Sequence, residues 1–300
     1  MLLTVTTSTG SSPGRPGFKI AVDEQGALSG SIGGGIMEVK LVELAKEHLK
    51  KGAAHPLLKR QIHHKTAPRD QSGMICSGEQ TVVFIPLKKA DLQTVKRMIR
   101  YLRQNTPAVL QISPAGIRLL KNQKNEVDYQ FAGQNESDFL FEENIGFKNQ
   151  LCIIGGGHCA LALSELMAKM DFYIRLFDDR PDLDTLKKNR FAHEKSVLEN
   201  YEDIAVFMPP GNNVYVVVMT LGYRSDEVVI RRLLDKNFKY FGVLGSAAKM
   251  KTLLDNLQKE GFPAQKLSQI RTPIGIPINS RTPEEIAVSI AAEIIAVKNS

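Results

Sequence analysis

The sequence contains no tryptophan and only three cysteines among its 300 residues. Cys76, Cys152 and Cys159 are too few for a disulfide framework, and no two of them form a C-x-x-C pair. The usual thiolate zinc site is therefore excluded, and we expect any special thiol to act alone. Cys152 lies in an apolar segment typical of a core strand, whereas Cys159 lies near a predicted helix start, where the thiol pKa is lowered.

Long apolar runs are also missing. The two longest apolar stretches, residues 151–168 and 286–297, are interrupted by His158 and Glu293. Neither reaches the run of about 18 uncharged residues that crosses a bilayer, so we predict no membrane span. Residues 1–10 lack a basic leader, an apolar stretch and a small-residue cleavage site. We therefore expect a cytoplasmic protein.

Basic residues exceed acidic ones by a small margin. The chain has 39 lysines and arginines against 32 aspartates and glutamates, a formal net charge of +7, and we expect the basic residues to be spread along both halves. Zinc-finger spacing, a heptad-linked basic region and an aromatic-rich RNA-binding signature are all absent, so we expect no nucleic-acid partner. The positive balance favours a small phosphorylated ligand.

The length of the chain corresponds to two domains. We predict an N-terminal domain over residues 1–132, a linker over 133–149 that begins with a polar stretch, and a C-terminal domain over 150–300. The fold class is α/β: a small N-terminal α/β domain is followed by a Rossmann-like, doubly wound parallel sheet.

Hydrophobic periodicity supports this division. The first half combines strands with two helices, predicted at residues 2–7, 36–51, 81–86 and from Asp91. The second half alternates strands and helices, which predicts a parallel sheet covered on both faces. Its elements are predicted at residues 151–154, 158–170, 172–177, 214–220, 225–237, 240–244 and 246–260. A last helix begins at Thr282-Pro283-Glu284-Glu285, which has the pattern of a capping box.

The strongest motif is Gly155-Gly156-Gly157-His158-Cys159-Ala160, a G-x-G-x-x-A sequence between a predicted strand and a predicted helix. Gly155 and Gly157 would let a pyrophosphate approach the amides at the helix start, and His158 either faces a phosphate or caps the helix. Asp178 lies 21 residues beyond Gly157, where a carboxylate would meet a ribose hydroxyl, and Asp179 is the adjacent rival. The alternative is a glycine turn that binds nothing.

A second glycine-rich segment precedes the first predicted helix. Its amides could form an anion nest, and an acidic residue in the first helical turn suits the helix dipole. Three residues of an earlier turn could add donors to the same site, although a hairpin without a ligand explains the pattern equally well. The candidates in these two segments are Gly10, Ser11, Ser12, Ser31, Gly33, Gly34, Gly35 and Glu38.

Two further segments carry candidate residues. Gly245 and Ser246 repeat the strand, glycine and helix pattern, with Ser246 as the predicted N-cap. Lys249 opposes the helix dipole there, so either an anion lies nearby or it is an ordinary surface lysine. Cys76 lies in a small-residue loop and is either a reactive thiol or a buried, inert one. A G-x-S-x-G nucleophile elbow is missing, and we assign no catalytic residue.

Together these motifs resemble the XdhC/CoxI family, also written XdhC/CoxF, of maturation factors for xanthine and carbon monoxide dehydrogenases. The resemblance rests on segments along nearly the whole chain: residues 10–14, 30–35 with Glu38, Cys76 with Gly78, 155–158, 178–181, 245–246 with Lys249, 273–275 and 281–287. It implies a cytoplasmic protein that binds the molybdenum cofactor, a molybdopterin in some cases extended to the cytosine dinucleotide. It also implies that the protein protects this cofactor during sulfuration and delivers it to a molybdenum hydroxylase such as xanthine dehydrogenase.

The resemblance carries further expectations and some departures. Cys76 matches the family's Cys-Gly-Gly loop and is the expected contact for molybdenum or its sulfur, although this chain reads Cys-Ser-Gly. A cysteine desulfurase partner and a homodimer are also implied. Relatives carry Cys where this chain has Gly35 and His where it has Leu221, and the chain starts at its first strand without their leading helix.

Two other functions compete with this interpretation. Residues 155–160 and Asp178 would also suit an NAD(P)-dependent oxidoreductase, but no pair of proton donor and substrate anchor can be nominated. A scaffold with a vestigial nucleotide site is the third possibility.

Overall fold

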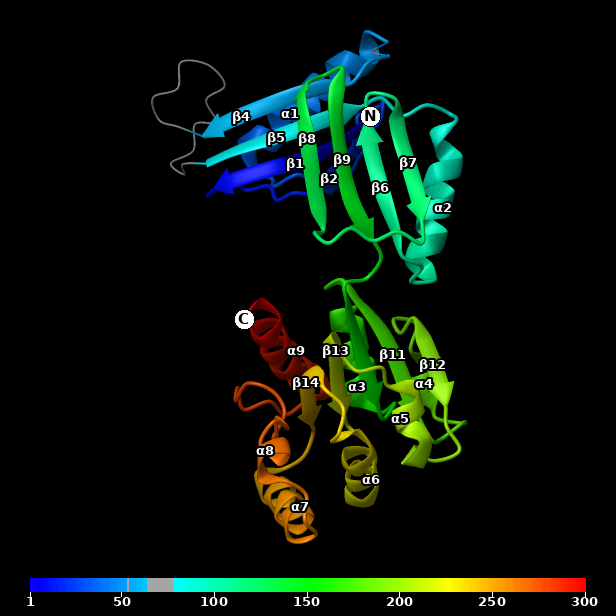
Figure 1. Ribbon diagram of the computed structural model, residues 1–300, viewed down its shortest axis with the longest axis vertical. Helices are drawn as coiled ribbons and strands as arrows, with labels where there is room; N and C mark the ends of the chain where they lie inside the picture. Colours follow the sequence, from blue (N-terminus) through cyan, green and yellow to red (C-terminus); the bar gives the residue numbers. More distant parts are fainter. Residues whose placement is uncertain (53, 64–77) are drawn as a thin grey trace. The chain divides into compact units, whose positions relative to one another are not determined.

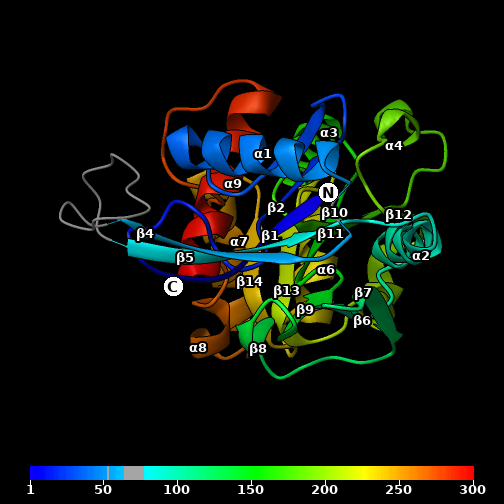
Figure 2. The same ribbon diagram turned by 90° about the horizontal axis from the view of Figure 1, so that it is seen from above.

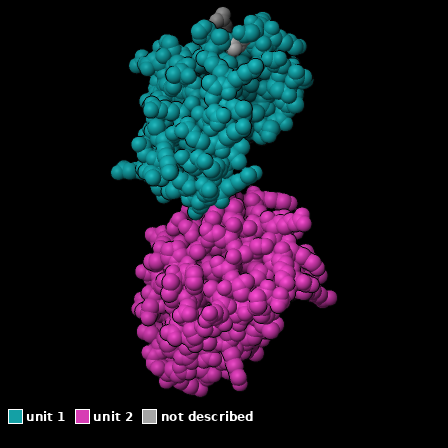
Figure 3. All heavy atoms as spheres, turned by 90° about the vertical axis from the view of Figure 1, so that its right-hand side faces the viewer, with its two compact units in different colours: residues 1–146 teal, residues 147–300 magenta. Residues whose placement is uncertain are grey.

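The computed structural model describes residues 1–52, 54–63 and 78–300. The chain divides into two compact units, residues 1–146 and 147–300, which Figure 3 colours separately, and each is described by itself. Throughout the described residues, every helix is too short or too polar to cross a lipid bilayer.

A five-stranded antiparallel sheet forms the centre of the N-terminal unit. Its strand order is β3-β2-β1-β5-β4, so β1 lies in the middle. The strands are β1 (Leu2–Gly10), β2 (Lys19–Val22), β3 (Leu28–Ser31), β4 (Leu57–His63) and β5 (Gly78–Ile85). Helix α1 (Gly35–Lys50) packs on one face of this sheet and buries Leu41, Val42 and Ala45 there.

A second antiparallel sheet covers the other face. Its order is β7-β6-β9-β8, and helix α2 (Asp91–Arg103) packs along β7. The strands are β6 (Ala108–Ser113), β7 (Gly116–Lys121), β8 (Tyr129–Asn135) and β9 (Asp138–Ile145). Val82 and Phe84 of β5 lie in the core with α1, whereas Val83 and Ile85 lie in the core with the second sheet, because successive side chains of a strand point to opposite faces. Figure 2 shows the resulting layers of α1, first sheet and second sheet.

The linker prediction over 133–149 is wrong for most of its length. Residues 133–145 belong to the hairpin of β8 and β9, and the polar stretch that suggested a linker is the turn between these strands. Phe139 and Phe141 alternate along β9 and are buried in the core. This alternation is the signal for a strand, and the polar turn residues beside it obscure the signal in the sequence.

A five-stranded parallel sheet organises the C-terminal unit. Its order is β12-β11-β10-β13-β14, with β10 (Asn149–Ile154), β11 (Phe172–Asp178), β12 (Glu194–Val197), β13 (Gly211–Val218) and β14 (Phe238–Val243). One core contains buried residues of α3 (His158–Met167) and α9 (Pro283–Asn299), and the core on the other face contains those of α6 (Tyr223–Leu233) and α7 (Ala247–Lys259). The remaining helices are short: α4 (Asp184–Lys188), the 3-10 turn η1 (Tyr201–Asp203), α5 (Ile204–Phe207) and α8 (Ala264–Leu267). The predicted α/β fold class and the doubly wound parallel sheet are confirmed (Figure 1).

The strand order places a ligand-binding position at β10 and β13. From β10 the chain moves outward through β11 and β12, and then returns to the other side of β10 at β13. The loops that follow two such strands turn away from each other and leave a crevice at the carboxyl edge of the sheet. The predicted capping box of Thr282 and Glu285 at the start of α9 is also present.

Candidate functional site

Gly155 holds the loop after β10 against the end of β13. Its φ angle is +104°, and a Cβ at this position would lie 2.2 Å from the carbonyl oxygen of Met219. Only glycine fits such an approach in this backbone conformation. The first glycine of the motif therefore fixes the geometry of the crevice.

Asp178 fixes the next glycine from inside the protein. Its carboxylate is fully buried and accepts hydrogen bonds from the Gly156 amide at 2.6 Å and from the Arg180 amide at 2.8 Å. The Arg180 guanidinium adds bonds of 2.8 Å from Nε and 2.7 Å from Nη2. Burial opposes ionisation, but the Arg180 and Gly156 hydrogen bonds outweigh it and lower the pKa of Asp178. Asp178 therefore lies where the sequence placed it, with its oxygens occupied by loop and arginine donors. Asp179 is partly exposed beside Arg180.

Gly157 leaves the start of α3 open. It is the N-cap residue, and a Cβ built on it would meet nothing within 4 Å. His158 is the first residue of the helix and is exposed, and neither it nor any other described side chain caps the helix start. The start of α3, with the positive end of the helix dipole, therefore lies at the crevice without a side-chain cap.

The loop after β13 is closed by an acidic side chain. Asp226 is 1% exposed, and its Oδ1 accepts hydrogen bonds from the Thr220 hydroxyl at 2.6 Å and the Thr220 amide at 3.2 Å. Lys249 Nζ lies 3.2 Å from Oδ2 of the same carboxylate. Burial raises the pKa of Asp226, and the Thr220 and Lys249 contacts partly offset this. The anion that explains Lys249 is thus a carboxylate of the protein itself. Ser246 caps α7 as predicted, by accepting a bond from the Lys249 amide, and Gly245 lies directly before it.

The backbone amides of the N-terminal glycine segment also bind a side chain of the protein itself. Oε2 of Glu38 accepts hydrogen bonds from the Ser31 hydroxyl and the Ile32 amide, both at 2.7 Å, and from the Gly34 amide at 3.0 Å. Burial opposes ionisation of Glu38, but these bonds outweigh it and lower its pKa. The nest predicted for a ligand anion therefore holds the carboxylate of Glu38. Gly35 follows with a φ of +71° and open space around it.

The earlier turn packs against the same segment. A Cβ on Gly33 would lie 2.6 Å from the Gly14 amide nitrogen, so the two loops touch. Ser12 is 2% exposed, and its hydroxyl donates to Gln80 Oε1 at 2.8 Å. Ser12 is therefore an internal donor, contrary to its predicted role toward a ligand, because buried Gln80 needs a partner for its carbonyl oxygen. Gly10 and Ser11 are exposed at the end of β1.

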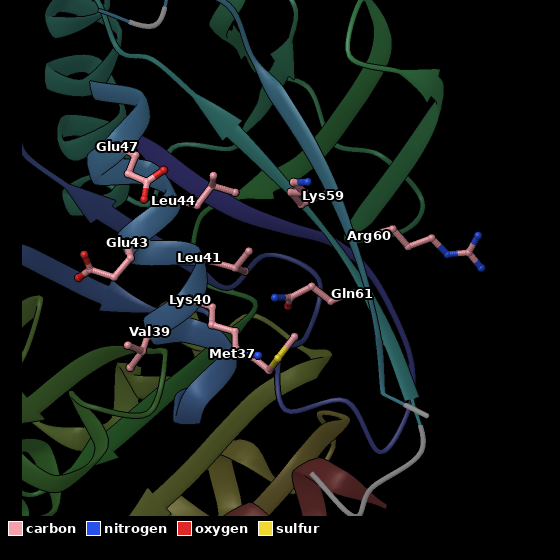
Figure 4. A pocket seen from close by; sticks show the side chains of 10 residues that line it. All are labelled: Met37, Val39, Lys40, Leu41, Glu43, Leu44, Glu47, Lys59, Arg60 and Gln61. Atoms are coloured by element: carbon pink, nitrogen blue, oxygen red, sulfur yellow. The ribbon is translucent and has the colours of Figure 1, made fainter. Parts of the chain in front are cut away.

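A groove of about 610 Å³ lies between α1 and the edge strand β4. Figure 4 shows the side chains of Met37, Leu41 and Gln61 pointing into it. Gln61 Oε1 accepts a hydrogen bond of 2.8 Å from Gln80 Nε2, and Gln80 in turn binds Ser12. The groove is thus connected by a buried amide network to the turn at Ser12, a link that no sequence motif indicated.

The start of α3 differs from the starts of the other two helices that have a glycine N-cap. Gly34, Gly157 and Gly222 are the N-caps of α1, α3 and α6, and in all three a Cβ would meet nothing within 4 Å. The fourth helical residue of α1 is Glu38 and that of α6 is Asp226, and each carboxylate accepts backbone amides of its preceding loop. Residue four of α3 is Leu161, and its first turn contains no acid. Among the described helices with a glycine N-cap, only α3 starts without its own carboxylate.

Two of the three cysteines, Cys152 and Cys159, lie in the described residues. Cys76 lies outside the described residues, so its predicted role at molybdenum stays a prediction. Burial raises the pKa of the Cys152 thiol to about 11. Burial and the neighbouring Glu284 raise the pKa of Cys159 as well, so the lowered pKa expected from its helix start is wrong. Within the described ranges, no three His, Cys, Asp or Glu side chains cluster as metal ligands.

Comparisons with known proteins agree with this architecture. The XdhC Rossmann domain family matches residues 151–294, and the XdhC and CoxI family matches residues 1–60. The chain is 31% identical over 165 residues to a probable xanthine dehydrogenase subunit of Bacillus subtilis, and 26% identical over 157 residues to the uncharacterized protein YqeB of Escherichia coli. These matches cover 53% and 52% of this chain but 46% and 28% of the relatives, so the chain spans less than half of either relative.

A solved structure extends the agreement to the whole fold. The crystal structure of a xanthine dehydrogenase from Bacillus halodurans is 23% identical, with a TM-score of 0.72, and the match covers 99% of this chain and 91% of that chain. At this identity the likeness concerns the fold. Family matches in both units, on the motifs that suggested the resemblance, show that the chain belongs to the XdhC and CoxI family.

Proposed function

We propose that this protein is a maturation factor for a xanthine dehydrogenase-type molybdenum hydroxylase. In this proposal it binds the molybdenum cofactor as cargo, protects it while the metal is sulfurated, and delivers it to the hydroxylase. Family membership and the xanthine dehydrogenase names of a relative and a solved structure support the client class. A cysteine desulfurase would supply the sulfur.

The single observation that carries the cargo proposal is the open start of α3. The cofactor is an anionic pterin phosphate, and amides at a helix start bind phosphate well. At α1 and α6 the amides of the loop before the helix already bind Glu38 and Asp226, which are the fourth residues of those helices, whereas the fourth residue of α3 is Leu161. The phosphate of the cargo would therefore bind at Gly157 and the first turn of α3, at the crevice between β10 and β13.

The chain's own residues would bind and orient this cargo, and no covalent step is assigned to them. Gly155 sets the loop against Met219, and Asp178 holds the Gly156 amide inward. The loop is therefore rigid before the ligand arrives, which lowers the entropic cost of binding. His158 is exposed beside the helix start and would donate a hydrogen bond to the same phosphate.

The position of Asp178 weighs against the rival oxidoreductase. In this fold a carboxylate at the position of Asp178 commonly binds the ribose hydroxyl of NAD. Both oxygens of Asp178 accept hydrogen bonds from Gly156 and Arg180, and the side chain is buried. We therefore expect NADH to bind weakly.

Gel filtration under anaerobic conditions tests the proposal. The full chain is mixed with free molybdenum cofactor, and molybdenum and pterin are measured in the protein peak. The wild type should retain the cofactor, Gly157→Ala should retain at least about tenfold less, and NADH should raise the thermal midpoint little. Absence of retention by well-folded wild type, or strong stabilisation by NADH, would overturn the proposal.

A further inference from the structure

The net positive charge of the chain comes from one segment. Residues 88–124 contain nine basic residues and one acidic residue, Asp91, a formal charge of +8. The whole chain carries +7, so the remainder is close to neutral. The basic residues themselves are spread along both halves as expected, 20 in residues 1–150 and 19 in 151–300, but acidic residues are nearly absent from this one segment. The nine are Lys88, Lys89, Lys96, Arg97, Arg100, Arg103, Arg118, Lys121 and Lys124, and all are exposed.

The fold places four of these nine residues along one helix. α2 lies at the outer edge of the N-terminal unit and packs along β7, as Figure 1 shows. Tyr101 and Met98 face the core, and the opposite side carries the cations. The ion pairs found between described residues all lie elsewhere in the chain. Cations three and four residues apart on a helix repel each other by a few tenths of a kcal/mol per pair, and a partner of opposite charge would relieve this repulsion.

Two large apolar side chains lie on the same exposed side of α2. Leu92 is 53% exposed and Ile99 is 43% exposed. With Lys96 and Arg103 they occupy spacings of four, three and four residues, which align them in one stripe along the helix. The stripe therefore alternates apolar and cationic groups.

We propose that this α2 surface, defined by Leu92, Lys96, Ile99 and Arg103, docks an acidic face of a partner protein. Protein interfaces combine an apolar centre with charged groups around it, and the stripe has both. Nucleic acid would contact the cations but leave Leu92 and Ile99 without apolar partners, and Tyr101 is buried rather than available for base stacking. The inference rests on the proposed function in one respect, because it identifies the partner as the molybdenum hydroxylase.

Electrostatic steering would be the main contribution of this surface. A concentrated charge raises the association rate with an oppositely charged face, and salt screens the effect over about 8 Å at physiological ionic strength. The α2 surface belongs to the N-terminal unit, whereas the residues proposed to bind the cofactor belong to the C-terminal unit. Variants in α2 should therefore leave cofactor retention intact.

Biolayer interferometry tests the docking surface with the full chain and the purified molybdenum hydroxylase of the same organism. At about 150 mM salt, Lys96→Glu/Arg103→Glu should weaken binding at least about tenfold, mainly through a slower association rate. Lys251→Glu/Lys259→Glu, which makes the same charge change at exposed positions of α7, should leave binding within about twofold. Leu92→Ser/Ile99→Ser, which keeps all charges, should weaken binding as well.

Two further probes test whether nucleic acid or an anionic membrane binds the α2 surface instead of a protein. A 20-base-pair DNA duplex and vesicles containing phosphatidylglycerol are tested at the same salt. Tight binding of either probe that Lys96→Glu/Arg103→Glu abolishes would overturn the proposal in favour of nucleic acid or membrane. Equal hydroxylase binding by the α2 and α7 variants, or none by the wild type, would also overturn it. Cofactor retention is measured on the same preparations, so loss of retention alone counts against the proposed function and not against the docking surface.

Discussion

The two outer glycines of the loop after β10 should respond in opposite ways to the same substitution. Gly155 has a φ of +104° and a carbonyl oxygen 2.2 Å from the position of a Cβ, whereas Gly157 has a φ of −69° and open space around it. Gly155→Ala should therefore damage the fold. Gly157→Ala should keep the fold and damage the binding of the cargo.

The magnitudes follow from the geometry. A non-glycine residue in an unfavourable backbone region costs about 1 to 3 kcal/mol. The contact with Met219 adds to this, because a backbone atom must move away, and we expect a total loss of at least about 3 kcal/mol for Gly155→Ala. Gly157→Ala replaces one N-cap residue by a poorer one at an unstrained position, which costs about 0.5 to 1 kcal/mol.

Urea unfolding followed by far-ultraviolet circular dichroism measures the two stabilities, and hydrogen exchange assigns the loss to the C-terminal unit. Cofactor retention on gel filtration measures the binding of Gly157→Ala. Unfolding of Gly155→Ala at the wild-type urea concentration would refute the steric role of Gly155. Retention of as much cofactor by folded Gly157→Ala as by the wild type would refute the binding role of Gly157.

Three further substitutions test the internal carboxylates and the helix caps. Glu38→Gln should cost about 1 kcal/mol at about pH 7. Because the folded pKa of Glu38 lies below its ordinary value of 4.5, this stabilisation is complete above about pH 4.5 and is lost as the pH falls through the folded pKa. The urea midpoints of variant and wild type should therefore converge as the pH falls below about 4.5. Asp178→Asn removes the buried carboxylate that pairs with Arg180 and should lower the free energy of unfolding in urea by about 2 to 4 kcal/mol. The control is Asp179→Asn at the partly exposed neighbour, which should lower it by less than about 0.5 kcal/mol. Thr282→Ala removes the capping box and should cost about 1 kcal/mol, with faster hydrogen exchange in the first turn of α9.

The Rossmann-like unit could be predicted from sequence because its signals are local. Alternation of apolar strands and amphipathic helices fixes a parallel sheet, and the glycine motif between β10 and α3 lies within ten residues. The capping box at Thr282 is equally local. In the N-terminal unit, by contrast, the paired residues of β1 and β5 lie 68 to 83 positions apart in the sequence, and this pairing has no local signature. In the second sheet β6 with β7 and β8 with β9 are local hairpins, and only the pairing of β6 with β9 joins distant segments without a local signature.

The internal partners of the candidate site were harder to predict. Lys249 pairs with Asp226 across 23 residues, and Ser12 binds Gln80 across 68 residues. Such contacts depend on the order of strands in the sheet, which is set by the whole fold. The sequence contains the acids at the fourth helical position, but their hydrogen bonds to the preceding loop can be inferred only when the first residue of each helix is known. The sequence predicts Glu38 only as a favourable charge at the positive end of the helix dipole. In the structure its carboxylate also accepts hydrogen bonds from the amides of the preceding loop.

A substitution at the fourth residue of α3 tests whether the missing carboxylate is what leaves the start of this helix free to bind an anion. Leu161→Glu would place a carboxylate in α3 at the position that Glu38 occupies in α1 and Asp226 in α6. Leu161 lines a surface hollow beside His158, so a glutamate there has room to reach back to the loop. The tethered carboxylate should compete with the phosphate of the cargo and reduce cofactor retention at least about tenfold, equivalent to about 1.4 kcal/mol.

Leu161→Gln provides the matched control, because it has the same length and polarity without the charge. It should retain cofactor within about threefold of the wild type. The effect of Leu161→Glu should also weaken as the pH falls toward about 4, since protonation removes the competing charge. Equal retention by the glutamate and glutamine variants would mean that the missing acid does not determine where the anion binds, and the assignment of the cargo phosphate to α3 would have to be abandoned.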